Sequence, residues 1–314
     1  MAIDRRAAPG VAAPCAAGIS LAPDPEPEPP AVPVPRLACD SHMHLFGPFG
    51  LYPPSEVERF MPAEAGYDQY EGTARKLGLQ RAVMVQSAAY GVDYRCLCDA
   101  LNRAKGRWRG IVLLDDRLTD RQLEVLAAAG VVGARLNCTE GQATLRRLAN
   151  WASRLRDLDW HVEILLTLDD LQEHRALLPE LGLSICIDHM GYTRAEQALG
   201  HPGLQTFERW LAGGACWTKL SGADRIGNRA AGYADVRSLI DRLLACGPDR
   251  LVWGTDWPHV SRRTMPNDGR LFNQFAGWVG DPGLLKRILA DNPSSLYGWP
   301  GATSQGSGVG DSGT

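Results

Sequence analysis

The stretch Cys39-Asp40-Ser41-His42-Met43-His44-Leu45-Phe46-Gly47 carries two histidines two positions apart, after a short apolar lead that begins at Leu37. In a β-strand, residues i and i+2 point to the same side. If this stretch is the end of a strand, both imidazoles are therefore directed at one place. The alternative is a pair of surface histidines in a loop, and the motif alone does not decide between the two.

Two distant stretches have the same form. Ile185-Cys186-Ile187-Asp188-His189-Met190-Gly191 and Leu251-Val252-Trp253-Gly254-Thr255-Asp256-Trp257-Pro258-His259 are each a short apolar run that ends in polar, titratable residues. A β/α barrel enzyme carries such residues at the C-terminal ends of its strands. The three stretches together predict one barrel mouth that gathers their histidines and Asp256.

Strand-like and helix-like stretches alternate between residues 37 and 300, which predicts a single (β/α)8 TIM barrel of the α/β class. Most of the strands are near-continuously apolar, as strands covered on both faces are. The alternative, an open doubly wound sheet that binds a nucleotide, needs a Gly-rich turn after the first strand, and here that strand ends in histidines. The expected strands are 37–43, 81–86, 110–114, 131–136, 160–166, 183–187, 216–220 and 250–254.

The two ends of the chain differ in composition from its middle. Residues 1–36 are rich in Ala and Pro and hold few bulky apolar side chains, so we expect a disordered tail. Residues 301–314 are rich in Gly and Ser, and we expect a flexible tail there. The barrel domain is then 37–300.

The overall composition narrows the class of protein. The 314 residues are 45% hydrophobic and 22% charged, with a net charge of -3, which is typical of a soluble globular protein and gives no case for nucleic acid binding. No apolar run reaches the roughly 18–20 residues of a membrane helix. The eight cysteines include no zinc-type CxxC pair. We expect a reducing, cytoplasmic location; a twin-arginine export signal at Arg5-Arg6 is disfavoured because prolines interrupt the weak apolar region after it. A homo-oligomer stays open.

The motifs DSHMH, IDHMG and WGTDWPH, at the first, sixth and eighth expected strands, resemble those of the amidohydrolase superfamily. Within it, the chain is similar to the 2-pyrone-4,6-dicarboxylate hydrolase branch of lactonases, over about residues 38–299. This resemblance implies a hydrolase that opens a lactone or related cyclic ester of a small carboxylic acid.

Lactone opening requires a base for water and an electrophile at the carbonyl. Asp256, at the end of the eighth strand, is the candidate base, and its alternative is a helix cap or loop carboxylate. His42, His44 and His189 would polarise the carbonyl as hydrogen-bond donors or hold a metal ion; His189 alone could also be a core histidine. His259 lies past the strand end and is interpreted as a loop residue.

The metal requirement follows from what the superfamily pattern lacks here. A binuclear amidohydrolase site resembles the HxH pair plus a bridging Lys or Glu on the fourth strand and a His at the end of the fifth. The fourth strand here offers Arg135 and Asn137, and His161 lies at the start of the fifth. A two-metal site is therefore not expected, and the resemblance to the lactonase branch implies that no metal is required. The alternative is a zinc-dependent decarboxylase of the same superfamily, with a single zinc ion on His42, His44, His189 and Asp256.

The substrate-binding candidates also follow from the resemblance. Arg135 and Arg225 match positions at which these lactonases hold a substrate carboxylate, although either could be a surface arginine. Lys219 is a candidate for the mouth or a strand-end surface lysine. Asn137 is a hydrogen-bond donor or a turn residue. Tyr192 is expected to line the pocket.

Several polar residues of these lactonases are replaced in this chain. A second arginine after the fourth strand falls on Gly141, a tyrosine on Leu165, a serine on Ala88 and a loop tyrosine on Phe60. We therefore expect a lactone with fewer anionic groups, or a more apolar body, than 2-pyrone-4,6-dicarboxylate.

Overall fold

The computed structural model describes residues 21–54, 62–139 and 145–300. Eight strands form one sheet in chain order, and each pairs in parallel with the next. The predicted (β/α)8 barrel is confirmed. The strands are β1 (Cys39–Met43), β2 (Arg81–Val85), β3 (Trp108–Leu113), β4 (Val131–Asn137), β5 (His161–Leu165), β6 (Ile185–Ile187), β7 (Cys216–Lys219) and β8 (Leu251–Val252).

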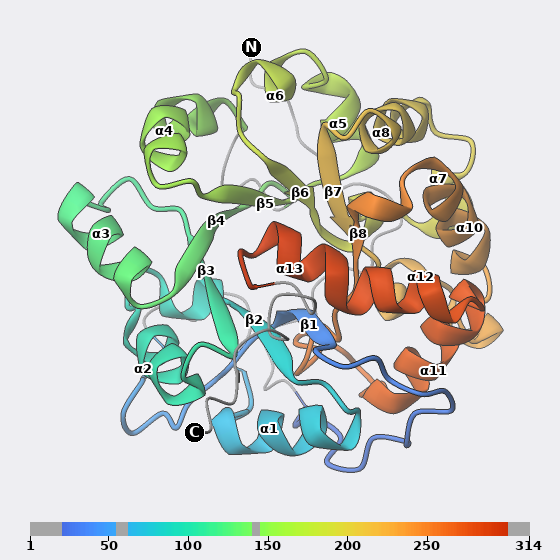
Figure 1. The fold of residues 1–314 in the computed structure, drawn as a ribbon, viewed down its shortest axis with the longest axis horizontal. Helices are drawn as coiled ribbons and strands as arrows, with labels where there is room; N and C mark the ends of the chain where they lie inside the picture. The colour runs from blue at the N-terminus through green and yellow to red at the C-terminus, as the bar shows by residue number, and fades with distance from the viewer. Residues whose placement is uncertain (1–20, 55–61, 140–144, 301–314) are drawn as a thin grey trace, which may run out of the picture.

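The helices surround the sheet, as Figure 1 shows. The helices are α1 (Tyr67–Lys76), α2 (Arg95–Ala104), α3 (Asp120–Ala128), α4 (Leu145–Asp157), α5 (Leu168–Glu173), α6 (Leu177–Glu180), α7 (Ala195–Ala198), α8 (Pro202–Ala212), α9 (Ala223–Ile226), α10 (Val236–Cys246), α11 (Asp268–Val279), α12 (Pro282–Lys286) and α13 (Asn292–Leu296). Two short helices, α5 and α6, follow β5, and a π-helical turn lies between α12 and α13.

Helix α13 lies across the N-terminal ends of the strands, at the centre of the view in Figure 1. Arg81, the first residue of β2, donates to Ser294 Oγ at 2.8 Å, and Asn292 Nδ2 donates to the carbonyl oxygen of Leu251 at 2.6 Å. The opposite end of the barrel, where the strands finish, is the end that carries the predicted site residues.

The barrel closes through the chain that follows β8. Ser41 N donates to the Trp253 carbonyl at 2.8 Å, Asp256 N donates to the His42 carbonyl at 2.8 Å, and His44 N donates to the Trp257 carbonyl at 2.8 Å. The hydrogen bonds that close the barrel therefore also hold the HxH motif of β1 beside Asp256.

Part of the N-terminal segment for which we expected a disordered tail is described by the structure and contacts the barrel. Residues 21–36 run along α11 and α1. Asn273 accepts from Ala31 N at 2.7 Å and donates to the Pro29 carbonyl at 2.9 Å, and Lys76 Nζ pairs with Glu26 at 2.6 Å. Proline reduces the chain entropy that ordering must overcome, which helps a Pro-rich segment to lie fixed on a helix. Residues 1–20 and 301–314 lie outside the described residues.

Seven of the eight cysteines lie in the described part, and all seven are free thiols. None of the helices described there combines the length and the hydropathy that a membrane crossing requires.

Candidate active site

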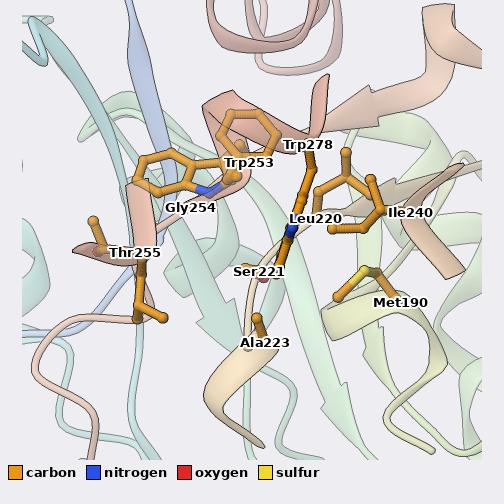
Figure 2. Close-up of a pocket in the computed structure, with 12 residues that line it drawn as sticks. Met190, Leu220, Ser221, Ala223, Ile240, Trp253, Gly254, Thr255 and Trp278 are labelled. Atoms are coloured by element: carbon orange, nitrogen blue, oxygen red, sulfur yellow. The ribbon is translucent and has the colours of Figure 1, made fainter. Parts of the chain in front are cut away.

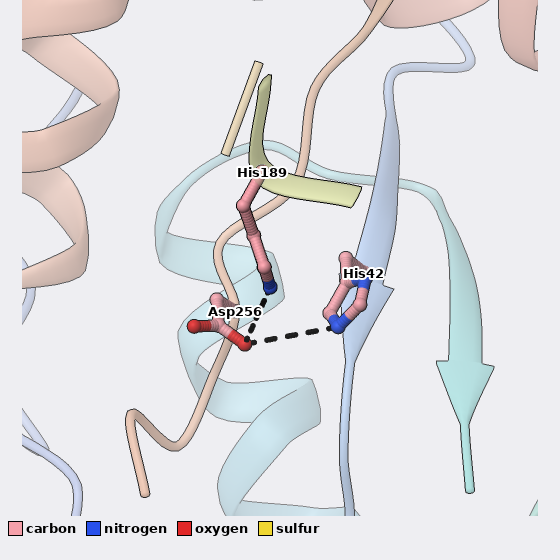
Figure 3. A group of neighbouring side chains, drawn as sticks. All are labelled: His42, His189 and Asp256. Atoms are coloured by element: carbon pink, nitrogen blue, oxygen red, sulfur yellow. Dashed lines mark ion pairs between the residues drawn. The ribbon is translucent and has the colours of Figure 1, made fainter. Parts of the chain in front are cut away.

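Three histidines surround one carboxylate at the C-terminal end of the barrel. Asp256 Oδ1 lies 3.7 Å from His42 Nε2, 3.7 Å from His44 Nε2 and 4.0 Å from His189 Nε2. Figure 3 shows how β1, the turn after β6 and the chain after β8 direct three of these side chains at one point. The predicted convergence of the three motifs is what the structure contains.

The backbone at two of these residues adopts a conformation that residues other than glycine rarely take. His189 has φ 51° and Asp256 has φ 64°, both in the left-handed region. Such conformations cost about 1–3 kcal/mol each and persist where surrounding contacts impose them, often at functional sites. Here the turns send both side chains inward from the ends of β6 and β8.

Asp40 joins β1 to the chain after β8, at the seam where the barrel closes. It is fully buried and accepts hydrogen bonds from His42 N, Thr255 N, Thr255 Oγ1 and Tyr70 Oη, at 2.6–3.0 Å. Burial raises the pKa of its carboxyl to about 6. The sequence interpretation gave Asp40 no role, although a carboxylate two residues before His42 in an apolar strand was a usable signal.

Gly254 allows the seam to close. A Cβ at this position would lie 2.6 Å from His42 N and 3.0 Å from Asp40 Oδ1. Only glycine lets the chain after β8 approach β1 this closely.

Arg225 is the direct partner of the candidate base. Its Nε donates to Asp256 Oδ2. Burial alone would raise the pKa of the Asp256 carboxyl, but Arg225 and the neighbouring imidazoles outweigh burial and hold that pKa well below its usual range. The carboxylate is therefore ionised at neutral pH.

Two of the imidazoles are neutral at neutral pH. Burial lowers the pKa of His189 to about 4. Burial also lowers the pKa of His42 well below its usual value, and the adjacent Lys219 adds to this effect. A neutral imidazole has one N–H donor and one acceptor nitrogen. The partner of the nitrogen that faces away from the site therefore decides whether the nitrogen that faces the site is a donor or an acceptor.

The outer nitrogens of His44 and His189 have different partners. His44 Nδ1 lies 2.7 Å from the Val85 carbonyl oxygen, which can only accept, so Nδ1 carries a hydrogen. In its neutral form His44 therefore turns an acceptor nitrogen toward Asp256, which differs from the predicted donor role. His189 Nδ1 lies 2.9 Å from Ser221 Oγ, which can donate or accept.

The predicted substrate-binding residues lie in different surroundings. Arg135 is nearly buried, and its Nε donates to Asp188 Oδ2 at 3.0 Å. Lys219 is fully buried inside the barrel, so the surface alternative is wrong. Asn137 accepts from Thr139 N and Oγ1 at 3.1 and 3.0 Å, as a turn residue does. The Tyr192 ring lies 5.9 Å from the His189 ring, centre to centre.

Two buried carboxylates near the site were not predicted. Glu163 lies on β5 and Asp188 directly precedes His189, and both are fully buried. Asp188 lies inside a motif that the sequence interpretation quoted, and Glu163 is the only charged residue of the β5 sequence HVEIL besides its first histidine. A charge in the middle of an apolar strand was the signal available for it.

His259 lies in the loop after β8, as the sequence interpretation had it, and it also makes a buried contact. It is buried, and its Nε2 lies 2.9 Å from Asp268 Oδ1 at the start of α11. Burial would lower the pKa of His259, but Asp268 outweighs it and raises that pKa. This contact ties the chain after β8 to α11.

The alternative of a single zinc ion can be tested on the donor set. One nitrogen each of His42 and His189 and one oxygen of Asp256 lie within 4.8 Å of one another, so spacing alone is compatible with an ion. However, Lys219 Nζ lies 2.9 Å from His42 Nδ1, and Arg225 is paired with Asp256. A zinc dication would meet two cations already bound to its ligands, so this set does not fit a four-ligand zinc site.

Neither cavity that stands out in the described residues is lined by the three histidines or Asp256. One has about 20 Å³, room for a water molecule, and lies behind Ser221 between the barrel and α11 (Figure 2). The other has about 770 Å³ and lies at the N-terminal ends of the strands, lined by residues such as His161 and Tyr297.

Four positions were predicted to lack polar residues that the lactonases carry. Leu165 is buried at the end of β5 and Ala88 is exposed after β2, whereas Phe60 and Gly141 lie outside the described residues.

Known proteins resemble this chain over most of its length. The chain is 32% identical to a 4-sulfomuconolactone hydrolase of Hydrogenophaga intermedia over 275 residues, 84% of this chain and 90% of that protein. It is 31% identical to a 2-pyrone-4,6-dicarboxylate hydrolase of Comamonas testosteroni over 284 residues, 86% and 93% of the two chains. A crystal structure from Agrobacterium tumefaciens superposes with a TM-score of 0.77 at 28% identity, covering 87% of this chain and 99% of that one. The amidohydrolase family model matches residues 39–299, and the chain therefore belongs to the amidohydrolase family.

Proposed function

We propose that this protein is a hydrolase that opens a lactone or related cyclic ester of a small carboxylic acid. The observation that carries the proposal is an ionised, buried carboxylate, Asp256, within 3.7–4.0 Å of three imidazoles at the barrel mouth. The relatives named above, whose substrates are a sulfomuconolactone and a pyrone dicarboxylate, support the same reaction class.

In this proposal Asp256 removes a proton from water, and the water oxygen forms a bond to the lactone carbonyl carbon. The carbonyl oxygen becomes an oxyanion, which His42 and His189 stabilise by hydrogen bonds. His44 accepts a hydrogen bond from the attacking water. The ring C–O bond then breaks, its oxygen takes the proton held by Asp256, and the new carboxylic acid ionises and releases a proton.

Arg135 and Arg225 anchor an acidic group of the substrate. Each arginine uses Nε for a carboxylate of the protein, but a guanidinium has five N–H donors and can bind a second carboxylate with its remaining ones. Tyr192, against His189, lines the same place. The leucine at the end of β5 favours a substrate with an apolar edge.

An acid-release assay with a pH indicator tests the proposal. The panel contains 2-pyrone-4,6-dicarboxylate, muconolactones and sugar lactones, each assayed with and without chelator. Hydrolysis of one class that resists the chelator supports the proposal. No hydrolysis of any lactone, together with zinc bound stoichiometrically to protein purified without added metal, would contradict it and favour the zinc-dependent decarboxylase.

A further inference from the structure

Lys219 is a buried cation that the proposed reaction does not itself use. Its Nζ lies 2.5 Å from Glu163 Oε2, 2.9 Å from His42 Nδ1 and 3.4 Å from Asp188 Oδ1, and all four side chains are fully buried. Buried ion pairs carry a large desolvation penalty, and apolar residues of the same volume often replace them without loss of stability. The position of this cluster, directly against His42, points to a role that acts through that imidazole.

The contact determines which nitrogen of His42 carries the hydrogen. An ammonium has three donors and no lone pair. Burial would lower the pKa of Lys219, but Glu163 and Asp188 outweigh burial and raise it, so Nζ is charged. A hydrogen on His42 Nδ1 would face these donors at 2.9 Å. Nδ1 must therefore accept, and the neutral ring carries its hydrogen on Nε2.

His42 Nε2 is the nitrogen that faces the site. It lies 3.7 Å from Asp256 Oδ1, and it is buried without a hydrogen-bond partner in the described part of the chain. A buried donor of this kind is available to an atom that arrives with the substrate.

We propose that Lys219 is a positioning residue that holds His42 in the Nε2–H form. His42 then offers a hydrogen-bond donor to the developing oxyanion and no lone pair to a metal ion. The oxyanion part of this inference rests on the proposed function. In their neutral forms, the two histidines of the HxH motif thus present opposite groups to the site. His44 Nε2 is an acceptor because its Nδ1 donates to the Val85 carbonyl, and His42 Nε2 is a donor because its Nδ1 accepts from Lys219.

Asp188 provides the acceptor that would let His42 change to the Nδ1–H tautomer if Lys219 were replaced. Its Oδ1 lies 3.4 Å from His42 Nδ1 and forms no hydrogen bond among the described residues. Without the ammonium, Nδ1–H can donate to this oxygen. Nε2 then becomes a lone pair, as in the zinc-binding histidines of metalloenzymes, where the other nitrogen donates to a carboxylate or carbonyl.

The test measures the His42 tautomer by long-range ¹H–¹⁵N NMR in full-length protein labelled with ¹⁵N-histidine, with His42→Asn used for assignment. Lys219→Met alone leaves buried carboxylates unpaired, so it is combined with Glu163→Gln. The matched control is Glu163→Gln alone, which keeps the lysine. We expect Nε2–H in the wild type and the control, and Nδ1–H in the double variant.

Two further readouts separate positioning from a structural role. In the double variant kcat should fall about 10²–10³-fold with KM nearly unchanged, because one oxyanion donor is lost. The same variant should bind Zn²⁺ more tightly than the control in equilibrium dialysis. A structural defect alone would not create a metal site.

The outcomes are distinct. A wild-type His42 with its hydrogen on Nδ1, or a double variant that keeps Nε2–H, overturns the inference. If the double variant does not fold, the wild-type tautomer alone decides the inference. If no lactone is hydrolysed, the proposed function fails, whereas the tautomer of His42 still supports or overturns the role of Lys219.

Discussion

Asp256 is the residue on which the proposed reaction depends most directly. Arg225 binds one of its oxygens and leaves the other to the three imidazoles. Arg225 keeps the carboxylate ionised, so that it can accept a proton, and the imidazoles surround its other oxygen. The left-handed backbone at Asp256 adds to the evidence that the surrounding structure imposes this position.

Replacement of the base should abolish most turnover. In Asp256→Asn the amide cannot take a proton from water, so we expect kcat for a confirmed lactone to fall about 10²–10⁴-fold. Circular dichroism and thermal unfolding of the same protein check that the fold survives the loss of the Arg225 ion pair. A folded variant with wild-type turnover would show that Asp256 is not the base.

The pH dependence should lack the usual histidine limb. Asp256 has a lowered pKa and must be ionised to act, and His189 has a pKa of about 4 and must be neutral to donate a single hydrogen bond. Both are in the required form above these values, so activity is present at higher pH and is lost on acidification through about pH 4. We expect kcat/KM to fall through about pH 4 as His189 gains a proton, whereas any change near pH 6 belongs to the Asp40 carboxyl, whose pKa is about 6. An NMR titration of His189 centred near pH 6.5 would contradict its assignment.

The turns after β6 and β7 pack against each other at His189. Gly222, at the turn before α9, has φ +71°, and a Cβ on it would lie 2.8 Å from His189 Nδ1. His189 in turn follows the three-residue strand β6. Packing between these two turns therefore decides the direction of one imidazole.

Two glycines with similar backbones allow this packing to be tested. Gly232 has φ +57° and nothing within 4 Å of an added Cβ, so Gly232→Ala should cost only about 1 kcal/mol of unfolding free energy, with kcat unchanged. Gly222→Ala carries the same backbone cost and also displaces His189, so it should lose about 1–3 kcal/mol more and lower kcat. Urea unfolding and steady-state kinetics measure both. Equal effects in the two variants would show that Gly222 does not position His189.

The barrel as a whole includes the Pro-rich segment 21–36, which lies on the outside against α11. An added Cβ on Gly269 of α11 would lie 1.9 Å from the Glu28 carbonyl oxygen, so helix and segment meet backbone to backbone. Because α11 also carries Asp268, the partner of His259, the segment supports the side of the barrel that holds the chain after β8.

This packing predicts a contrast within one helix. Gly269→Ala must displace the segment and should cost about 1–3 kcal/mol of unfolding free energy, with faster proteolysis near the N-terminus. Gly277→Ala, with open space around its Cβ on the same helix, should stabilise by about 0.5–1 kcal/mol. Urea unfolding and limited proteolysis measure both effects. Equal stability of the two variants would mean that the segment is not packed on α11 in solution.

The sequence by itself determined the barrel and the place of its chemistry. Apolar runs that end in DSHMH, IDHMG and TDWPH are local patterns, and parallel strands bring their C-terminal ends to one side by the rules of the fold. His42, His44, His189 and Asp256 therefore could be predicted to converge, and the structure contains that convergence.

Only the tertiary structure decided which charges lie beneath that site. Lys219 contacts Glu163, 56 residues earlier, and His42, 177 residues earlier. Alternation along β7 restricts Lys219 to one of two sides, but strand tilt and register across the barrel decide whether that side is solvent or a buried carboxylate. The same is true of the N-terminal segment, whose composition indicates disorder until α11 supplies a surface for it. Local pattern encodes the strand ends, whereas partners distant in the sequence are determined by the closed barrel.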